Sequence, residues 1–129
     1  MTLEISDKAR ALLEKPVLVN LATVRPDGAP QVNPMWFKWD GELLWFTHTS
    51  YRQKYKNIAH EPRVSISIMD PDSGYDYLEI RGVVETVEAD PEATMYQTLS
   101  EWYDGKAVVP ADAKDRVKIG VRPTKLSGM

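Results

Sequence analysis

Near the start of the chain, hydrophobic residues recur at helical spacing. The segment SDKARALLEK places its apolar side chains on one face of a helix, and Ser6 in front of them is a residue type that caps helix N-termini. We therefore predict a helix over residues 7–14, which Pro16 ends. The β-branched run VLVNLATV that follows is apolar on both faces, and this pattern predicts a central strand.

Turn signals divide the next part of the chain into three strands. The turn RPDG separates VLVNLATV from PQVNPMWFKW, and the dipeptide Asp40-Gly41 separates that segment from ELLWFTHT. Both signals are typical of hairpins, because their residues favour the backbone conformations that tight turns need. We therefore predict a three-strand antiparallel meander.

Strict alternation of apolar and polar residues marks the second half of the chain. RVSISIMD and YDYLEIRGVVETVEA alternate as strands with one buried face do, and Gly82 predicts a bulge or a close backbone approach. DPEATMYQTLSEW predicts a helix capped by Asp90 with Pro91 at its first position, and RVKIGVRP predicts a last strand. The predicted fold is one domain over residues 1–129, mainly β (α+β), with six strands closing toward a barrel and about three short helices.

Composition narrows the possible chemistry. Because the chain has no cysteine, it has no disulfides, thiolate metal sites or thiol nucleophiles. No apolar run reaches the length of a signal peptide or a membrane span, so we expect a cytoplasmic protein without a membrane partner. The two histidines lie far from any carboxylate cluster at ligand spacing, so no metal site is expected. Without a Gly-rich phosphate loop, nucleophile elbow or acid–base pair, no catalytic residue is predicted.

One basic segment departs from the acidic balance of the chain. The formal net charge is −3, yet TSYRQKYKNIAHEPR is rich in Lys and Arg. We interpret Ser50 as a helix N-cap in a capping-box relation with Gln53, which puts Arg52 at the positive end of the helix dipole. That arrangement is favourable if an anion, best a phosphate, binds there, and Lys54 and Asn57 lie on one face to share it. The alternative is a solvated basic helix face.

A second signal lies in PQVNPMWFKW. Pro34 cannot donate to a β-ladder, so the strand should have an edge, a bulge or a gap at this point. Asn33, Met35 and Trp36 around it could contact the edge and the faces of a flat heterocycle. The alternative is a barrel strand whose aromatic residues are simply core. A planar-ring site beside a phosphate site is what a flavin-type nucleotide requires.

Three segments carry a family resemblance over nearly the whole chain: VNLATVRPDGAPQVNPMWF, LLWFTHTSYRQKYKNIAHEPRVSISI and YLEIRGVVE. Their order resembles the pyridoxamine 5'-phosphate oxidase-like split β-barrel superfamily, and within it the small reductases that use the deazaflavin coenzyme F420 in place of FMN. The resemblance implies a split barrel and a homodimer with cofactor sites in the subunit interface. The cofactor-binding residues that it implies are Arg52, Lys54 and Asn57 for the phosphate, Gln31, Asn33, Pro34, Met35 and Trp36 along the ring, Thr47, Thr49 and Ser50 at its border, and Tyr75 and Tyr77 as candidates for contact with the other subunit's site.

The resemblance leads us to expect an oxidoreductase that transfers a hydride between coenzyme F420 and a small planar, electron-poor organic substrate. The alternatives are an FMN-dependent oxidoreductase of the same fold and a non-catalytic flavin, deazaflavin or tetrapyrrole-binding protein. A small β-barrel that binds nucleic acid is disfavoured by the acidic charge. The segment VRPTKLSGM differs from the Arg-Leu-x-Pro type of segment in true pyridoxamine phosphate oxidases, so we expect no vitamin B6 oxidation.

Overall fold

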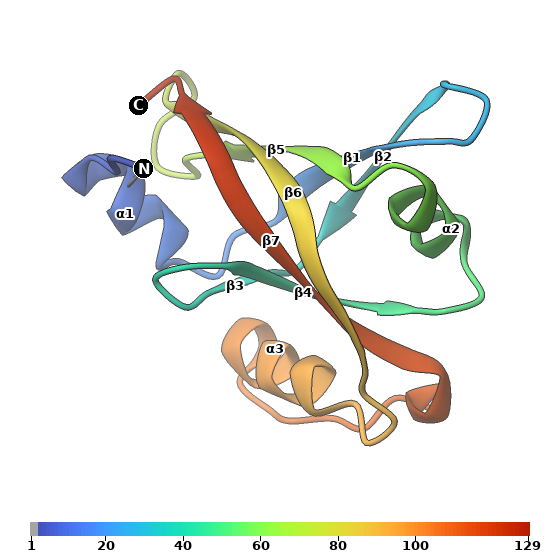
Figure 1. Cartoon of the computed structure of the whole chain (residues 1–129). Helices are drawn as coiled ribbons and strands as arrows, with labels where there is room; N and C mark the ends of the chain where they lie inside the picture. The colour runs from blue at the N-terminus through green and yellow to red at the C-terminus, as the bar shows by residue number, and fades with distance from the viewer. Residues whose placement is uncertain (1–2) are drawn as a thin grey trace.

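The computed structural model describes residues 3–129. One antiparallel sheet of seven strands, in the order β2-β1-β5-β6-β7-β4-β3, curls into a half-barrel with α1 and α2 at opposite sides (Figure 1). This confirms the predicted mainly β split barrel, with seven strands in place of six. The elements in chain order are α1 (Asp7–Leu13), β1 (Val19–Val24), β2 (Pro30–Met35), β3 (Lys38–Trp39), β4 (Leu44–Thr49), α2 (Gln53–His60), β5 (Arg63–Met69), β6 (Tyr77–Ala89), α3 (Thr94–Asp104), the 3₁₀ turn η1 (Ala113–Asp115) and β7 (Arg116–Ser127).

The first helix and the alternating strands form as predicted. The Ser6 hydroxyl accepts a hydrogen bond from the backbone N–H of Ala9 at 3.1 Å, which caps α1. In β5, Val64, Ile66 and Ile68 are buried while the residues between them face outward. These inward residues join those of α1, β1, β4, β6 and β7 in one hydrophobic core.

The predicted three-strand meander is wrong in one respect. PQVNPMWFKW forms two short strands, β2 and β3, which lie at opposite edges of the sheet. The break falls at Trp36 and Phe37. Phe37 is fully buried, and its N–H donates to the Tyr103 hydroxyl of α3 at 3.1 Å, so a tertiary contact draws the chain from one sheet edge to the other. The split adds the seventh strand and leaves Pro34 on an edge strand, one of the predicted alternatives.

Gly82 marks both a bulge and a close approach, as predicted. The pairing of β6 with β7 shifts register between Arg81 and Gly82. A Cβ at Gly82 would lie 2.9 Å from the carbonyl oxygen of Arg122. No other residue type fits there without moving the backbone of β7.

The predicted start of α3 is corrected from Pro91 to Thr94. Ala93 adopts φ +54°, the left-handed region, which breaks the helical path before Thr94. The N-cap is Ala93 rather than the predicted Asp90, but the Asp90 carboxylate accepts hydrogen bonds from the backbone N–H groups of Thr94 at 3.0 Å and Met95 at 2.9 Å, the first two residues of the helix. These bonds hold the pKa of Asp90 below its usual value against the opposing effect of burial.

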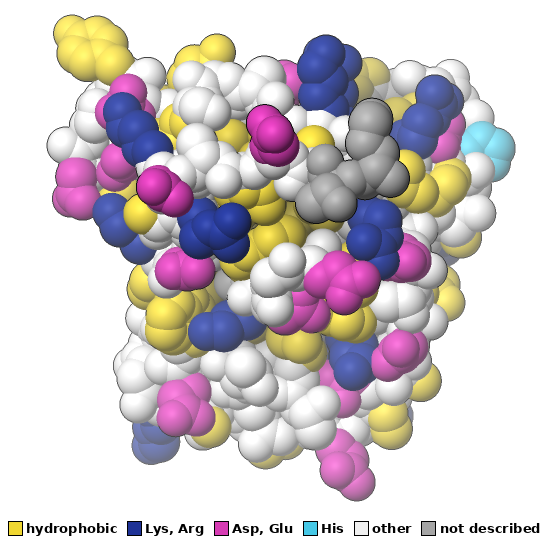
Figure 2. Space-filling view, turned by 60° about the vertical axis from the view of Figure 1, so that its left-hand side comes forward, with side chains coloured by type: hydrophobic (Ala, Val, Ile, Leu, Met, Phe, Trp, Pro, Cys, Tyr) yellow, Lys and Arg dark blue, Asp and Glu magenta, His cyan; other side chains and the backbone are white. Residues whose placement is uncertain are grey.

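The outer surface mixes charges of both signs. On the face shown in Figure 2, basic and acidic side chains are interspersed, with no extended basic patch. In the part of the chain that the structure describes, no helix is both long and apolar enough to span a membrane.

Candidate functional site

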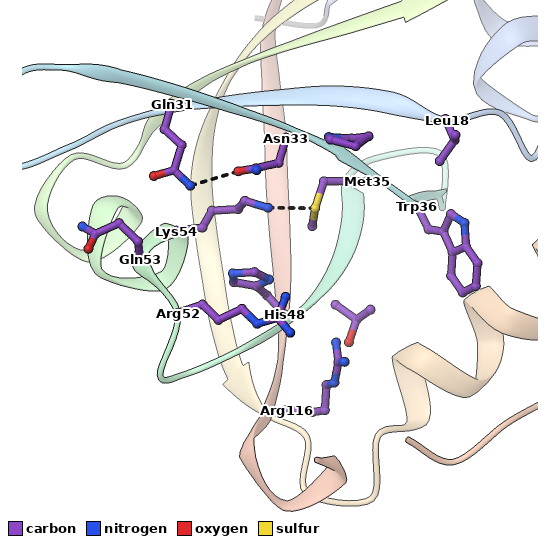
Figure 3. A pocket seen from close by; sticks show the side chains of 12 residues that line it. Leu18, Gln31, Asn33, Met35, Trp36, His48, Arg52, Gln53, Lys54 and Arg116 are labelled. Carbon is purple, nitrogen blue, oxygen red and sulfur yellow. Dashed lines mark hydrogen bonds between the residues drawn. The ribbon is translucent and has the colours of Figure 1, made fainter. Parts of the chain in front are cut away.

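A cavity of about 730 Å³ opens between β2, β4, the start of α2 and the start of β7 (Figure 3). Its wall is apolar on one side and basic on the other. It brings together many of the predicted site residues: Gln31, Asn33, Pro34, Met35, Trp36, Thr47, Arg52 and Lys54. It also contains four residues outside the set of predicted cofactor-binding residues: Leu18, His48, which the sequence placed near the ring without a binding role, Gln53 and Arg116.

Lys54 is a buried cation to which the described part of the chain offers no counter-ion. Only 4% of the residue is exposed, and its Nζ lies 2.9 Å from the thioether sulfur of Met35. Within residues 3–129, no carboxylate forms an ion pair with it. Burial, with a smaller contribution from Arg52, lowers the pKa of Lys54 to about 8. A thioether accepts hydrogen bonds weakly, so this side chain lacks the partner that a buried charge requires.

Two arginines add positive charge at the same end of the cavity. Arg52 is exposed, and no ion pair to it is found among the described residues. Arg116 is partly neutralised, because its Nε donates to Asp112 at 3.0 Å and its guanidinium lies 4.7 Å from the centre of the Tyr96 ring. The lining residues include no Asp or Glu in the part of the chain described.

The predicted N-cap of α2 is wrong. The helix begins at Gln53 with Arg52 as its N-cap, and no side chain caps it. Ser50 is held elsewhere, since its N–H donates to the carbonyl oxygen of Asp115 at 3.0 Å. The uncapped N–H groups of the first turn therefore remain available beside Arg52 and Lys54, which is the combination that binds anions.

Asn57 lies behind the cavity rather than in its wall. It is completely buried and donates to the Thr23 hydroxyl at 2.9 Å and to the Gln31 side-chain oxygen at 3.1 Å. Its own side-chain oxygen accepts from Gln53 at 2.8 Å, and Gln31 donates to Asn33 at 3.0 Å. This network links α2 to β1 and β2 and orients Gln31 and Asn33 along the cavity.

Three consecutive side chains of β4 have buried polar atoms that find no hydrogen-bond partner within residues 3–129. These atoms are Oγ1 of Thr47, Nε2 of His48 and Oγ1 of Thr49. Buried polar atoms are nearly always hydrogen-bonded, so three in succession call for an explanation. The pKa of His48 is lowered to about 4 by burial and by the charges of Lys54, Arg52 and Arg116.

The cavity residues outside the predicted cofactor-binding set differ in how well the sequence indicated them. His48 lies between Thr47 and Thr49, so its neighbours were the signal. Arg116 had none, because it reaches the site through the pairing of β7 with β4, in which it opposes Thr49.

The structure does not bring five predicted residues into the cavity wall: Thr49, Ser50, Asn57, Tyr75 and Tyr77. The two tyrosines lie at the hairpin between β5 and β6, on the side of the sheet away from α2 (Figure 1). Tyr75 is 94% exposed and Tyr77 is 50% exposed. Their contact with another subunit's site stays a prediction.

A curled antiparallel half-barrel with a cavity at its side defines a split β-barrel protein, and several basic side chains line that cavity. The family model of pyridoxamine 5'-phosphate oxidase matches residues 5–129, and the chain belongs to this family.

Solved structures show the same architecture. An F420 reductase is 53% identical with a TM-score of 0.93, and the match covers 97% of this chain and 100% of that one. A conserved hypothetical protein from Mycobacterium tuberculosis is 26% identical with a TM-score of 0.77, over 96% of this chain and 84% of that one. The heme storage protein HutZ from Vibrio cholerae, 22% identical with a TM-score of 0.69 over 98% and 95% of the two chains, shares the fold.

Proposed function

We propose that this protein is an oxidoreductase that binds coenzyme F420 in the cavity and transfers a hydride between it and a small planar, electron-poor organic substrate. The observation that carries the proposal is Lys54, a buried cation beside the uncapped start of α2 that has no counter-ion among the residues the structure describes. The likeness to a structure described as an F420 reductase supports the choice of cofactor. FMN is the second choice, because it also combines a phosphate with a flat tricyclic ring.

The cavity residues fit such a ligand. Arg52, Lys54 and the first N–H groups of α2 would hold the phosphate, since charge-assisted bonds to backbone and side chains are the usual means of binding it. Met35 and Trp36 offer apolar surface to a ring, and Thr47 has an unpartnered hydroxyl for a polar atom. A volume of about 730 Å³ lies within the usual range for cofactor sites.

When bound, the reduced deazaflavin supplies the hydride, and this chain supplies position and surroundings. The aromatic contacts of Trp36 keep one wall rigid, because its ring stacks on Tyr103 with centres 5.0 Å apart. The Tyr103 hydroxyl also donates to the carbonyl oxygen of Val17 at 2.7 Å, which ties α3 to the segment entering β1. With no carboxylate in the described lining, we propose that water provides the proton that accompanies the hydride.

The proposal includes a homodimer. Leu18 and Val32 are 63% and 62% exposed, and Leu18 lies at the rim of the cavity. A second copy that covered this rim would remove apolar surface from water and exclude solvent from the ring. Light scattering should give the mass of two chains, and a monomer that still binds the cofactor would contradict this part of the proposal.

A side-by-side titration with coenzyme F420 and FMN tests the cofactor. Binding measured by calorimetry should be tighter for F420, and reduced F420 should be oxidised when an electron-poor planar acceptor is added. Tighter binding of FMN would favour the second choice. Tight binding without turnover of any acceptor would favour a carrier, and binding of neither cofactor would overturn the proposal.

Lys54→Ala tests the phosphate contact. It removes a charge-assisted hydrogen bond worth roughly 1.5–3 kcal/mol, which corresponds to an affinity loss of about 10- to 150-fold. Lys56→Ala is the matched control, because Lys56 is exposed on the same helix and does not line the cavity. Equal losses for both variants would indicate a diffuse basic surface instead of a phosphate site.

A further inference from the structure

His48 presents an unused polar atom in a cavity lined with cations. The residue is 7% exposed, lines the cavity and has no partner for Nε2 among the described residues. In the view of Figure 3 its imidazole lies between the side chains of Lys54 and Arg52. The proposed hydride transfer gives this ring no role.

We propose that His48 is a ligand-binding residue that takes up one proton when an oxyanion binds in the cavity, so that its Nε2–H donates to the ligand. The proposal rests on the proposed function in one respect, namely that the cavity binds an anion. The proton comes from solvent, imidazole becomes imidazolium, and no other bond changes.

The charges around His48 explain why the proton is absent before binding. From the start of α2, Lys54 and Arg52 face it, and from β7 Arg116 does. The carboxylate next to these cations, Asp112, is engaged by Arg116 at 3.0 Å. The side chains that β2 contributes to the cavity carry no charge. Protonation would add a further positive charge to a buried ring that already faces three cations. Burial and the repulsion from these cations therefore lower the pKa of His48 to about 4.

An anion in the cavity reverses this balance. A bound dianion compensates the charges of Lys54 and Arg52, so these residues repel a proton on His48 less strongly. The dianion also attracts the imidazolium and accepts a hydrogen bond from it. Because linkage is reciprocal, an anion that raises the pKa of His48 must itself bind more tightly as the pH falls.

Sulfate is the probe, because its charge does not change over the range of about pH 5 to 7, in which Lys54 also keeps its proton. Proton NMR follows the two histidine rings during pH titrations with and without sulfate. We expect sulfate to raise the pKa of His48 by about one to two units. A His48 pKa that does not move when sulfate binds would overturn the inference.

Variants give a second measurement. The affinity for sulfate should increase roughly 2- to 10-fold from pH 7 to pH 5 in the wild-type protein, which corresponds to a rise of about one to two units in the pKa of His48. It should become nearly flat in His48→Gln and should keep its slope in His60→Gln. Circular dichroism checks that each variant is folded. Binding that needs Lys54 but has the same slope in His48→Gln overturns this inference and leaves the proposed function intact. Absence of binding for both sulfate and coenzyme F420 overturns both.

Discussion

Both halves of β4 contain deeply buried residues, but these residues are chemically opposite. Leu44 and Phe46, in the first half, are fully buried and belong to the hydrophobic core. In the second half, Thr47, His48 and Thr49 are 9%, 7% and 1% exposed, yet each has a polar atom without a partner. Depth of burial therefore does not distinguish core from site in this barrel. Unpartnered polar atoms mark the second half of β4 in the part of the chain described, and two of the residues that carry them, Thr47 and His48, line the cavity.

Two basic residues, Arg122 and Lys54, show a similar contrast between a paired polar group and one that is unpaired among the described residues. Arg122, far along β7 from the cavity, is paired with Glu42 at 2.9 Å and Glu85 at 2.8 Å. Lys54 is more deeply buried and forms no ion pair with a described carboxylate. Arg122 is thus neutralised by carboxylates, whereas Lys54 has no ion-pair partner among the described residues in the cavity where we propose that an anion binds.

The largest expected effect concerns the core half of β4. Phe46→Ala removes a fully buried ring from the centre of the core, and we expect the free energy of unfolding to fall by about 3–5 kcal/mol. Urea unfolding followed by tryptophan fluorescence measures it. A loss below about 1 kcal/mol would mean that the first half of β4 is not the rigid core described above.

Lys54→Met should raise the free energy of unfolding, whereas Phe46→Ala lowers it. Because the pKa of Lys54 is about 8 in the folded protein and 10.5 in the reference state, carrying the charge at pH 7 costs the folded state about 3 kcal/mol. The apolar variant should therefore be more stable by about 1–3 kcal/mol at pH 7 and should lose cofactor affinity.

The pH dependence of the same variant sharpens the test. Between about pH 8 and 10.5 the unfolded wild-type chain binds more protons at Lys54 than the folded protein, so wild-type stability gains from this group as pH rises. Lys54→Met lacks that gain. Urea unfolding at pH 7 and pH 10 compares the two proteins, and a variant that is less stable than wild type at pH 7 would show that Lys54 is compensated in the folded state.

The smallest effect separates the two threonines of β4. Thr49→Val replaces an unpartnered buried hydroxyl by a methyl group of the same shape, so we expect stability to rise by up to about 1 kcal/mol and cofactor affinity to stay the same. Thr47→Val should give a similar gain but weaken cofactor binding, because Thr47 lines the cavity. Calorimetric titration and thermal melting check both variants. Equal affinity losses would mean that Thr49 also contacts the ligand.

Local patterns were sufficient for much of the fold and for part of the site. The cap of α1 and the alternation in β5 follow from interactions within a few residues or from the period of one strand. Gly82 was recognisable from its residue type, although the bulge itself arises where β6 pairs with β7. The same holds for Arg52 and Lys54, which are close in sequence and therefore close in space in any helical turn.

Contacts between distant segments decided the rest. The capping pattern at Ser50 is overridden by a backbone bond to Asp115, and the meander is broken by the bond from Phe37 to Tyr103. Arg116 joins the cavity because β7 pairs with β4, and His48 is held neutral by charges from separate elements. The sequence by itself determined where elements form and which short basic segment is unusual. Only the tertiary structure decided which cations lack partners, because pairing and burial depend on residues that the sequence places tens of positions apart.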